Sequence, residues 1–162
     1  MRRIYEMASR TLIWLGDHAH GSEAVSTLLR EIERLGPSEQ MELITATSRS
    51  MVTPGNMAWS HMLEALPPSS DPRWLALNAF VQRRWFRRVW IIQELAVSRE
   101  IQLHCRNTQL EWEPLAIAVT LSANIGMIET FSDTGVTSIL SLFLIRGFIQ
   151  MGTKKPLLSL LL

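Results

Sequence analysis

The chain contains a single cysteine, Cys105, among its 162 residues. One cysteine excludes an internal disulfide and is typical of proteins in a reducing compartment. Lysine and arginine (16) nearly balance aspartate and glutamate (15), so the formal net charge of +1 would gather neither nucleic acid nor anionic lipid. We therefore expect a cytoplasmic protein that binds no nucleic acid.

Long apolar runs and glycine-rich motifs are also missing. The most apolar stretch, residues 139–145, is far shorter than the ~20 residues that a membrane helix needs. The apolar run at residues 11–15 is followed at once by Gly16 and Asp17, so it is not a secretory leader. The glycine signatures of serine hydrolases, P-loop proteins and dinucleotide-binding folds do not occur. We expect no membrane span, no bound cofactor and no metal.

Apolar residues make up 47% of the chain and charged residues 19%, which is a globular composition with enough length for one core. Residues 2–10 resemble a helix, and residues 11–15 (Thr-Leu-Ile-Trp-Leu) predict a fully buried strand. An amphipathic helix should then run from about residue 22 to residue 35. A strand followed by an amphipathic helix is the half-unit of a parallel sheet, so we predict an α/β fold with helices flanking a parallel sheet.

Residues 71–106 are the stretch around which we expect the rest of the chain to be organised. Asp71 and Pro72 are a suitable N-cap and first residue for one helix. A second helix should run from Trp85 to about Ser98, and residues 101–105 should form a strand, with a short hairpin arm at residues 109–111. The buried stripe of the second helix would consist of Phe86, Val89, Ile92 and Ala96.

One face of that second helix carries a candidate site. Trp90 and Glu94 lie four residues apart, and Arg87 lies one turn before Glu94, so all three share a helical face. A carboxylate beside a tryptophan near a buried strand suits a catalytic site. The same three residues also suit a salt bridge at a helix surface, and both interpretations remain open.

The remaining segments suggest a domain plan. Residues 38–70 predict short helices within an insertion of about that length. A helix should open at Glu113 and Pro114, and a strongly apolar helix should cover residues 136–151 after a loop at residues 126–135. We therefore divide the chain into a main domain, residues 1–124, and a helical C-terminal section, residues 125–162, which we expect to be truncated.

Three motifs resemble the fungal heterokaryon-incompatibility (HET) domain. Residues 13–16 (Ile-Trp-Leu-Gly), preceded by Ile4, Tyr5 and Ala8, are similar to one motif of that family. Residues 83–94 (Arg-Arg-Trp-Phe-Arg-Arg-Val-Trp-Ile-Ile-Gln-Glu) are similar to a second motif, with Arg84 where the family has proline. Residues 110–112 (Leu-Glu-Trp) match a third. The family's first two strand motifs are absent, so the chain resembles the C-terminal part of a HET domain.

HET domains are in turn similar to TIR domains, which have a flavodoxin-like parallel sheet. The resemblance therefore implies an incomplete TIR-like or flavodoxin-like sheet. Nucleotide-cleaving TIR domains carry a catalytic glutamate in a Trp-Cys-x-x-Glu-Leu segment, and residues 90–95 keep its Trp, Glu and Leu, with Ile91 at the cysteine position. The resemblance thus implies that Glu94 is the catalytic carboxylate of a glycohydrolase that takes NAD as substrate, with Trp90 and Arg87 in support. We expect the complete domain to be the active form and this shortened chain to be inactive.

Other polar residues admit simpler interpretations. The arginines at positions 83, 84, 87 and 88 interleave with aromatics, but we interpret them as a solvated or ion-paired face. Asp17, His18 and His20 could contribute to a metal site, although we prefer a polar loop. Neighbouring strand residues point to opposite faces, so His104 and Cys105 cannot form a catalytic pair, and Cys105 should be buried.

The function implied by the resemblance is that of an effector in fungal non-self recognition, or heterokaryon incompatibility, that leads to programmed cell death through cleavage of NAD or a related nucleotide. Its partners would be proteins of an incompatibility or cell-death assembly, including other copies of the chain. The alternative is a non-catalytic signalling or assembly module, or an inactive remnant. A purely helical adaptor would require residues 11–15 to be helical.

Overall fold

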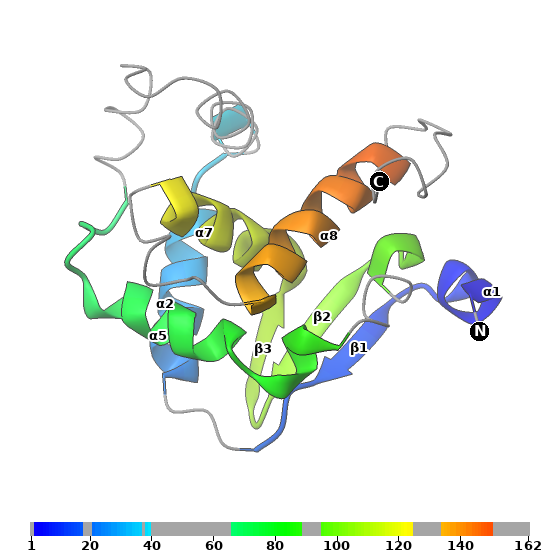
Figure 1. Ribbon diagram of the computed structural model, residues 1–162, viewed down its shortest axis with the longest axis horizontal. Helices are drawn as coiled ribbons and strands as arrows, with labels where there is room; N and C mark the ends of the chain where they lie inside the picture. Colours follow the sequence, from blue (N-terminus) through cyan, green and yellow to red (C-terminus); the bar gives the residue numbers. More distant parts are fainter. Residues whose placement is uncertain are drawn as a thin grey trace.

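A computed structural model describes residues 2–17, 21–36, 38–39, 66–88, 95–124 and 134–150. Within these residues the chain is a mixed α/β protein, as the sequence predicts (Figure 1). None of the helices in this part of the chain is long and apolar enough to cross a membrane.

Three strands form one mixed sheet in the order β1–β2–β3. β1 (Thr11–Trp14) pairs in parallel with β2 (Ile101–Cys105), and β2 pairs antiparallel with β3 (Thr108–Glu111). The predicted hairpin arm is thus confirmed as β3. The observed strand at residues 11–14 also excludes the helical adaptor.

Five α-helices and one 3₁₀ helix are described. These are α1 (Arg2–Met7), α2 (Ser22–Glu33), α5 (Pro72–Val81), η2 (Arg84–Arg87), α7 (Trp112–Asn124) and α8 (Thr134–Gln150). α2 packs against α5, α7 and β3, and α7 also packs against β2 and α8. Figure 1 shows α2, α5 and α7 gathered on one side of the sheet, with α1 at the opposite side next to β1.

The core lies between the sheet and these helices. Ile13, Leu103 and Leu110 stand side by side in the register of the three strands, and all are buried. They meet the apolar stripe predicted for α2, which consists of Val25, Leu28, Leu29 and Ile32 and is completely or almost completely buried. Burying each of these side chains contributes about 1.5–3 kcal/mol relative to leaving it exposed, so this layer orients β1 and β2.

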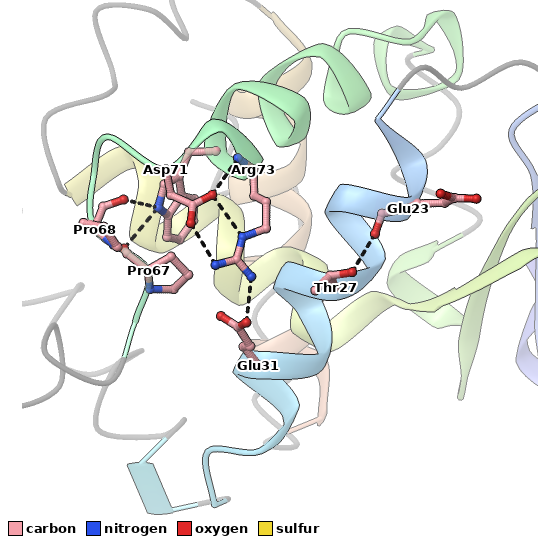
Figure 2. A network of polar contacts seen from close by, with 8 residues as sticks. Glu23, Thr27, Glu31, Pro67, Pro68, Asp71 and Arg73 are labelled. Atoms are coloured by element: carbon pink, nitrogen blue, oxygen red, sulfur yellow. Dashed lines mark hydrogen bonds and ion pairs between the residues drawn. The ribbon is translucent and has the colours of Figure 1, made fainter.

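Asp71 begins α5 as predicted and also fixes its orientation. Its carboxylate accepts a hydrogen bond from the Arg73 backbone N–H at 2.9 Å, and its two oxygens accept from the Arg73 guanidinium at 3.0 and 2.8 Å. The same guanidinium donates to Glu31 on α2 at 2.6 Å (Figure 2). Hydrogen bonds and charge from Asp71 and Glu31 raise the pKa of Arg73 further above its usual range. This ion-pair network holds α5 against α2.

β1 is not fully buried, and that prediction is wrong. Ile13 is buried, but Leu12 and Trp14 keep 63% and 58% of their surface exposed. β1 is the edge strand of the described sheet, and the helices that pack on the sheet lie on the face of Ile13. An apolar run predicts burial on both faces, but here one face lacks a covering layer among the described residues.

The predicted helix from Trp85 to Ser98 is also interrupted. Residues 84–87 form a 3₁₀ turn, and Arg88 then adopts an extended backbone with φ −83° and ψ 124°. Helical structure is described again at residues 95–97. Phe86 and Ala96 are buried as expected, whereas Val89 and Ile92 lie outside the described residues.

Several other predictions fall on boundaries or outside the described residues. α8 begins at Thr134, two residues earlier than the loop prediction allows. Most of the expected insertion, residues 40–65, lies outside the described part, as do residues 125–133 and 151–162. The proposed domain boundary at residue 124 stays a prediction.

Candidate functional site

The carboxyl ends of the two parallel strands lie together at one edge of the sheet. The Gly16 carbonyl accepts hydrogen bonds from the Arg106 backbone N–H at 3.2 Å and from the Cys105 thiol at 3.4 Å. Gly16 has a φ of 94°, a conformation that glycine adopts without the strain other residues would suffer. Ligands of open α/β sheets bind outside this edge, so we take it as the candidate site.

Arg83 extends from the end of α5 to this edge. Its Nη1 donates to Cys105 Sγ at 2.9 Å, and its guanidinium carbon lies 4.5 Å from the centre of the Phe80 ring. The two contacts fix the plane of a partly exposed guanidinium. Among the described residues, the arginines that form ion pairs with carboxylates are Arg10, Arg73 and Arg146, and none of these ion pairs includes Arg83. Arg83 is therefore a cation placed to receive an anionic group.

Arg87, the supporting residue predicted from the sequence, lies one turn further along at the end of η2. It is exposed, and its Nη2 donates to Gln82 Oε1 at 2.7 Å. The turn itself is anchored by Phe86, which is buried and packs edge-on against Trp85 with ring centres 5.0 Å apart. Arg87 therefore lies close in the chain to Arg83, at the entrance to the segment that carries Glu94.

Trp90 and Glu94 lie outside the described residues, so their roles stay predictions. The residue directly after Glu94 is buried and hydrogen-bonded. Leu95 is completely buried, and its carbonyl accepts a hydrogen bond from Arg146 Nη1 at 2.6 Å. The same Nη1 donates to the Ser98 carbonyl at 2.6 Å. Arg146 therefore fixes the backbone at residues 95–98, directly after the segment that carries Glu94.

Arg146 donates these hydrogen bonds from α8. Only 3% of its surface is exposed, and its Nη2 also donates at 3.3 Å to the Arg99 carbonyl and to Glu113 Oε1. Burial lowers the pKa of the Arg146 guanidinium, and the charge and hydrogen bond of Glu113 oppose that shift. A buried cation that donates to backbone carbonyls at the end of a helical turn is favourable, because these carbonyls form the negative end of the helix dipole.

The face of the sheet opposite to Ile13 and Leu103 carries a row of polar side chains. Gln102 Nε2 donates to Glu111 Oε1 at 2.7 Å, and Gln102 Oε1 lies 3.0 Å from His104 Nε2. Trp14 stands beside His104 in the register of β1 and β2. An exposed indole thus borders a hydrogen-bonded polar row on this face.

The other sequence candidates are not brought together into a site. His104 and Cys105 contact different partners on opposite faces of β2, and Cys105 is completely buried. Asp17 is exposed at the end of β1, whereas His18 and His20 lie outside the described residues. Within the described ranges no three metal-binding side chains are clustered.

Two polar contacts were not predicted from the sequence, those of Arg83 with Cys105 and of Arg146 with the chain after Glu94. Arg146 did carry a signal, because it is the one charged residue in the apolar stretch at residues 136–151. Charged residues are almost never fully buried unless they have partners, so a lone arginine in such a helix indicates a buried acceptor. Its position in the chain does not identify the acceptor, which lies 51 residues away for Leu95.

Comparison with protein families matches residues 1–94 to the family described as "Heterokaryon incompatibility protein (HET)". The matched segment includes β1, α2, α5 and η2 and ends at Glu94. Neither the curated proteins nor the solved structures provide a significant match.

Proposed function

The chain belongs to the heterokaryon incompatibility family, and on that premise we propose that it is an effector of fungal non-self recognition that cleaves NAD or a related nucleotide. Family membership itself implies a role in heterokaryon incompatibility. The proposal adds a TIR-like reaction in which Glu94 is the catalytic carboxylate, and programmed cell death as its consequence.

The position of Arg83 is the observation that best supports a nucleotide substrate. Its guanidinium is held at the carboxyl edge of β1 and β2 by Cys105 and Phe80. A planar guanidinium with free N–H groups matches the oxygens of a phosphate. Arg83 and Glu94 belong to one continuous segment of the family match, and we propose that Arg83 binds the diphosphate of the nucleotide whose ribose Glu94 contacts.

The chemistry requires a fixed carboxylate at the ribose. When the bond between the ribose C1′ and the nicotinamide nitrogen breaks, the electron pair leaves with nicotinamide and positive charge develops on the sugar ring. The Glu94 carboxylate would stabilise that cation and accept hydrogen bonds from the ribose hydroxyls. Water then adds to C1′ and releases a proton, giving ADP-ribose. Trp90 would exclude water from the reacting ribose and strengthen its interaction with Glu94.

A second candidate function is that of a non-catalytic assembly module. The exposed side chains of Leu12 and Trp14 on an edge strand favour it, because large apolar residues on an unpaired edge are typical of interaction surfaces. In that case Glu94 would belong to a surface ion pair, and the chain would act in incompatibility through protein contacts alone.

The test is the release of nicotinamide from NAD by this chain extended upstream with the family's first two strand motifs, which is the form expected to be active, compared with the same form carrying Glu94→Gln or Arg83→Met. We expect Glu94→Gln to lower kcat at least about a hundredfold, as is usual when a group that stabilises the transition state is removed. Arg83→Met should mainly raise KM, because it removes a contact made equally by bound substrate and transition state.

Glu100→Gln is the matched control, since Glu100 is exposed and pairs only with the exposed Arg10 in the described residues. It should keep the activity of the unmodified chain. Equal activity of Glu94→Gln and the unmodified chain would reject Glu94 as the catalytic residue. If NAD is not consumed, and expression of Glu94→Gln kills fungal cells as the unmodified chain does, the assembly module is the correct function.

A further inference from the structure

The outer edge of β1 has backbone groups available for a further strand. The Thr11 N–H donates to the Glu100 carbonyl and the Leu15 N–H to the His104 carbonyl, both at 2.8 Å, so the odd-numbered residues face β2. The N–H and C=O groups of Leu12 and Trp14 therefore point away from β2. β1 is terminal in the strand order of the described residues.

The side chains on this edge lack the usual protection against pairing. Edge strands normally carry lysine, proline or a bulge that discourages another strand from adding. β1 has none of these, and the two residues whose backbone groups point outward, Leu12 and Trp14, also have large exposed side chains. Within the described ranges, backbone groups that no strand pairs and exposed apolar surface thus coincide on the same two residues.

We propose that β1 pairs antiparallel with β1 of a second copy of the chain across a two-fold axis at Ile13. This self-association goes beyond the proposed reaction and does not depend on it. In this register Leu12 of one copy lies opposite Trp14 of the other, and the symmetry repeats the pair. Four hydrogen bonds then form between the outward N–H and C=O groups of Leu12 and Trp14.

The register also makes the exposed side chains complementary. A two-fold axis perpendicular to the sheet keeps side chains on their own face, so both pairs of Leu12 and Trp14 meet on the exposed face. Cross-strand pairs of an aromatic and an aliphatic side chain stabilise a sheet. Each copy would cover the apolar surface of the other and continue the three-stranded sheet into one of six strands.

Charge favours a second copy in the antiparallel direction. Arg10 precedes β1 and Asp17 follows it by three residues, and both are exposed. Antiparallel pairing brings the start of β1, where Arg10 pairs with Glu100 of its own chain, toward the end of β1 in the other copy, where Asp17 lies, and the symmetry creates this approach twice. Parallel pairing would bring Arg10 against Arg10. Opposite charges at both ends of a self-paired strand thus select the second copy as the occupant and the antiparallel orientation.

The experiment measures the mass of the full 162-residue chain by sedimentation equilibrium over a wide range of concentrations. We expect a monomer–dimer equilibrium, because an interface based on four-residue strands is small and therefore weak. Leu12→Lys and Trp14→Lys each place a charge in the cross-strand pair of Leu12 and Trp14, and each should raise the dimer Kd at least about tenfold. Leu75→Lys is the matched control: Leu75 is 60% exposed on α5, and its substitution should leave Kd unchanged.

Cysteine cross-linking tests the register independently and requires no disruptive charge. Mixed Leu12→Cys and Trp14→Cys chains should form a disulfide with each other faster than either forms one with itself, because those two residues face each other. The unmodified chain, whose Cys105 is buried, should not cross-link.

The proposal fails if the unmodified chain is monomeric at every concentration, or if Leu75→Lys weakens the dimer as strongly as Leu12→Lys. It also fails if Leu12→Cys or Trp14→Cys chains cross-link best with themselves. If the chain is monomeric and instead binds an extended strand of another protein at β1, that protein, and not a second copy, is the partner of this edge.

Discussion

The guanidinium of Arg146 donates to the Leu95 carbonyl at 2.6 Å, across 51 positions of the chain. This contact joins α8 to the residue directly after Glu94. The C-terminal helix thus does more than cover the core with Ile139 and Leu142, both of which are buried. It also fixes the exit of the segment that carries the proposed catalytic carboxylate.

Arg146→Met should destabilise the protein substantially. Methionine keeps much of the aliphatic packing but leaves the Leu95 and Ser98 carbonyls without their buried donor. Hydrogen bonds to a charged group contribute about 1.5–3 kcal/mol each, so we expect the free energy of unfolding to fall by about 3 kcal/mol. Urea denaturation followed by circular dichroism measures this difference.

Arg99→Met provides the control for Arg146→Met. Arg99 is exposed and accepts the Arg146 hydrogen bond only through its backbone carbonyl, which the substitution keeps. Its free energy of unfolding should change by less than about 0.5 kcal/mol. Equal effects of the two substitutions would contradict the role assigned to the buried guanidinium.

The ion pair of Asp71 and Arg73 should make stability depend on pH in the acid range. Hydrogen bonds from Arg73 lower the pKa of Asp71 below its ordinary value of 3.8 in the folded protein. The unfolded chain therefore binds the Asp71 proton more tightly, so the stabilisation is present above that ordinary value and is lost as pH falls through the folded pKa. Asp71→Asn should make the acid loss of stability less steep.

Two substitutions separate the charge of Asp71 from its capping role. Asparagine caps a helix as well as aspartate does, so Asp71→Asn removes the charge and keeps the cap, whereas Asp71→Ala removes both. At pH 7 Asp71→Ala should be less stable than Asp71→Asn by about 1 kcal/mol. Unfolding curves at several pH values measure both effects. If Asp71→Asn loses stability at acid pH as steeply as the unmodified chain, the ion pair of Asp71 and Arg73 is not the cause of that loss.

Sequence reasoning succeeded where the signal was local. The cap at Asp71, the proline after it and the stripe of α2 each depend on residues within one or two turns of each other. The parallel pairing of β1 with β2 was also predictable, because a helix between two apolar strands favours that topology.

The features that were not predicted from the sequence depend on contacts between distant segments. A five-residue apolar run cannot reveal that Leu12 lies on an edge, because exposure is decided by which other segments cover it. The helical periodicity of Phe86 and Val89 continued through Arg88, where the backbone is extended and the 3₁₀ turn has ended. The acceptors of Arg83 and Arg146 lie on other elements, so the sequence shows only that such cations need partners.

Two buried tryptophans provide a matched pair for measuring one hydrogen bond. Trp74 and Trp112 are both at least 99% buried, but the Trp74 indole N–H donates at 3.2 Å to the carbonyls of Pro67 and Pro68. The Trp112 indole N–H has no acceptor among the described residues. Replacement by phenylalanine removes similar volume from each site. Trp74→Phe should therefore cost about 1 kcal/mol more than Trp112→Phe.

Urea denaturation of the two phenylalanine variants under one set of conditions checks this difference. If Trp112→Phe lowers the free energy of unfolding more than Trp74→Phe does, cavity size and not the hydrogen bond determines the destabilisation at these sites.

The single thiol allows the contact between Arg83 and Cys105 to be tested directly. Cys105 is completely buried, and its sulfur lies between the Arg83 guanidinium and the Gly16 carbonyl. A thiol reagent should react with it at least about a hundredfold more slowly in the folded protein than in urea, because reaction requires local opening. Arg83→Met removes one of the two contacts and should reduce that protection.

Leu75→Cys supplies an internal standard for thiol reactivity. Leu75 is 60% exposed, so the variant should show one rapidly reacting thiol and one slowly reacting thiol in the same molecule. Two thiols reacting at the same rate would show that the end of β2 opens readily. Arg83 would then lack a fixed position at the carboxyl edge, and the proposed phosphate contact would lose its support. Slow reaction of Cys105 that becomes faster in Arg83→Met would instead confirm that the guanidinium is held there by the thiol.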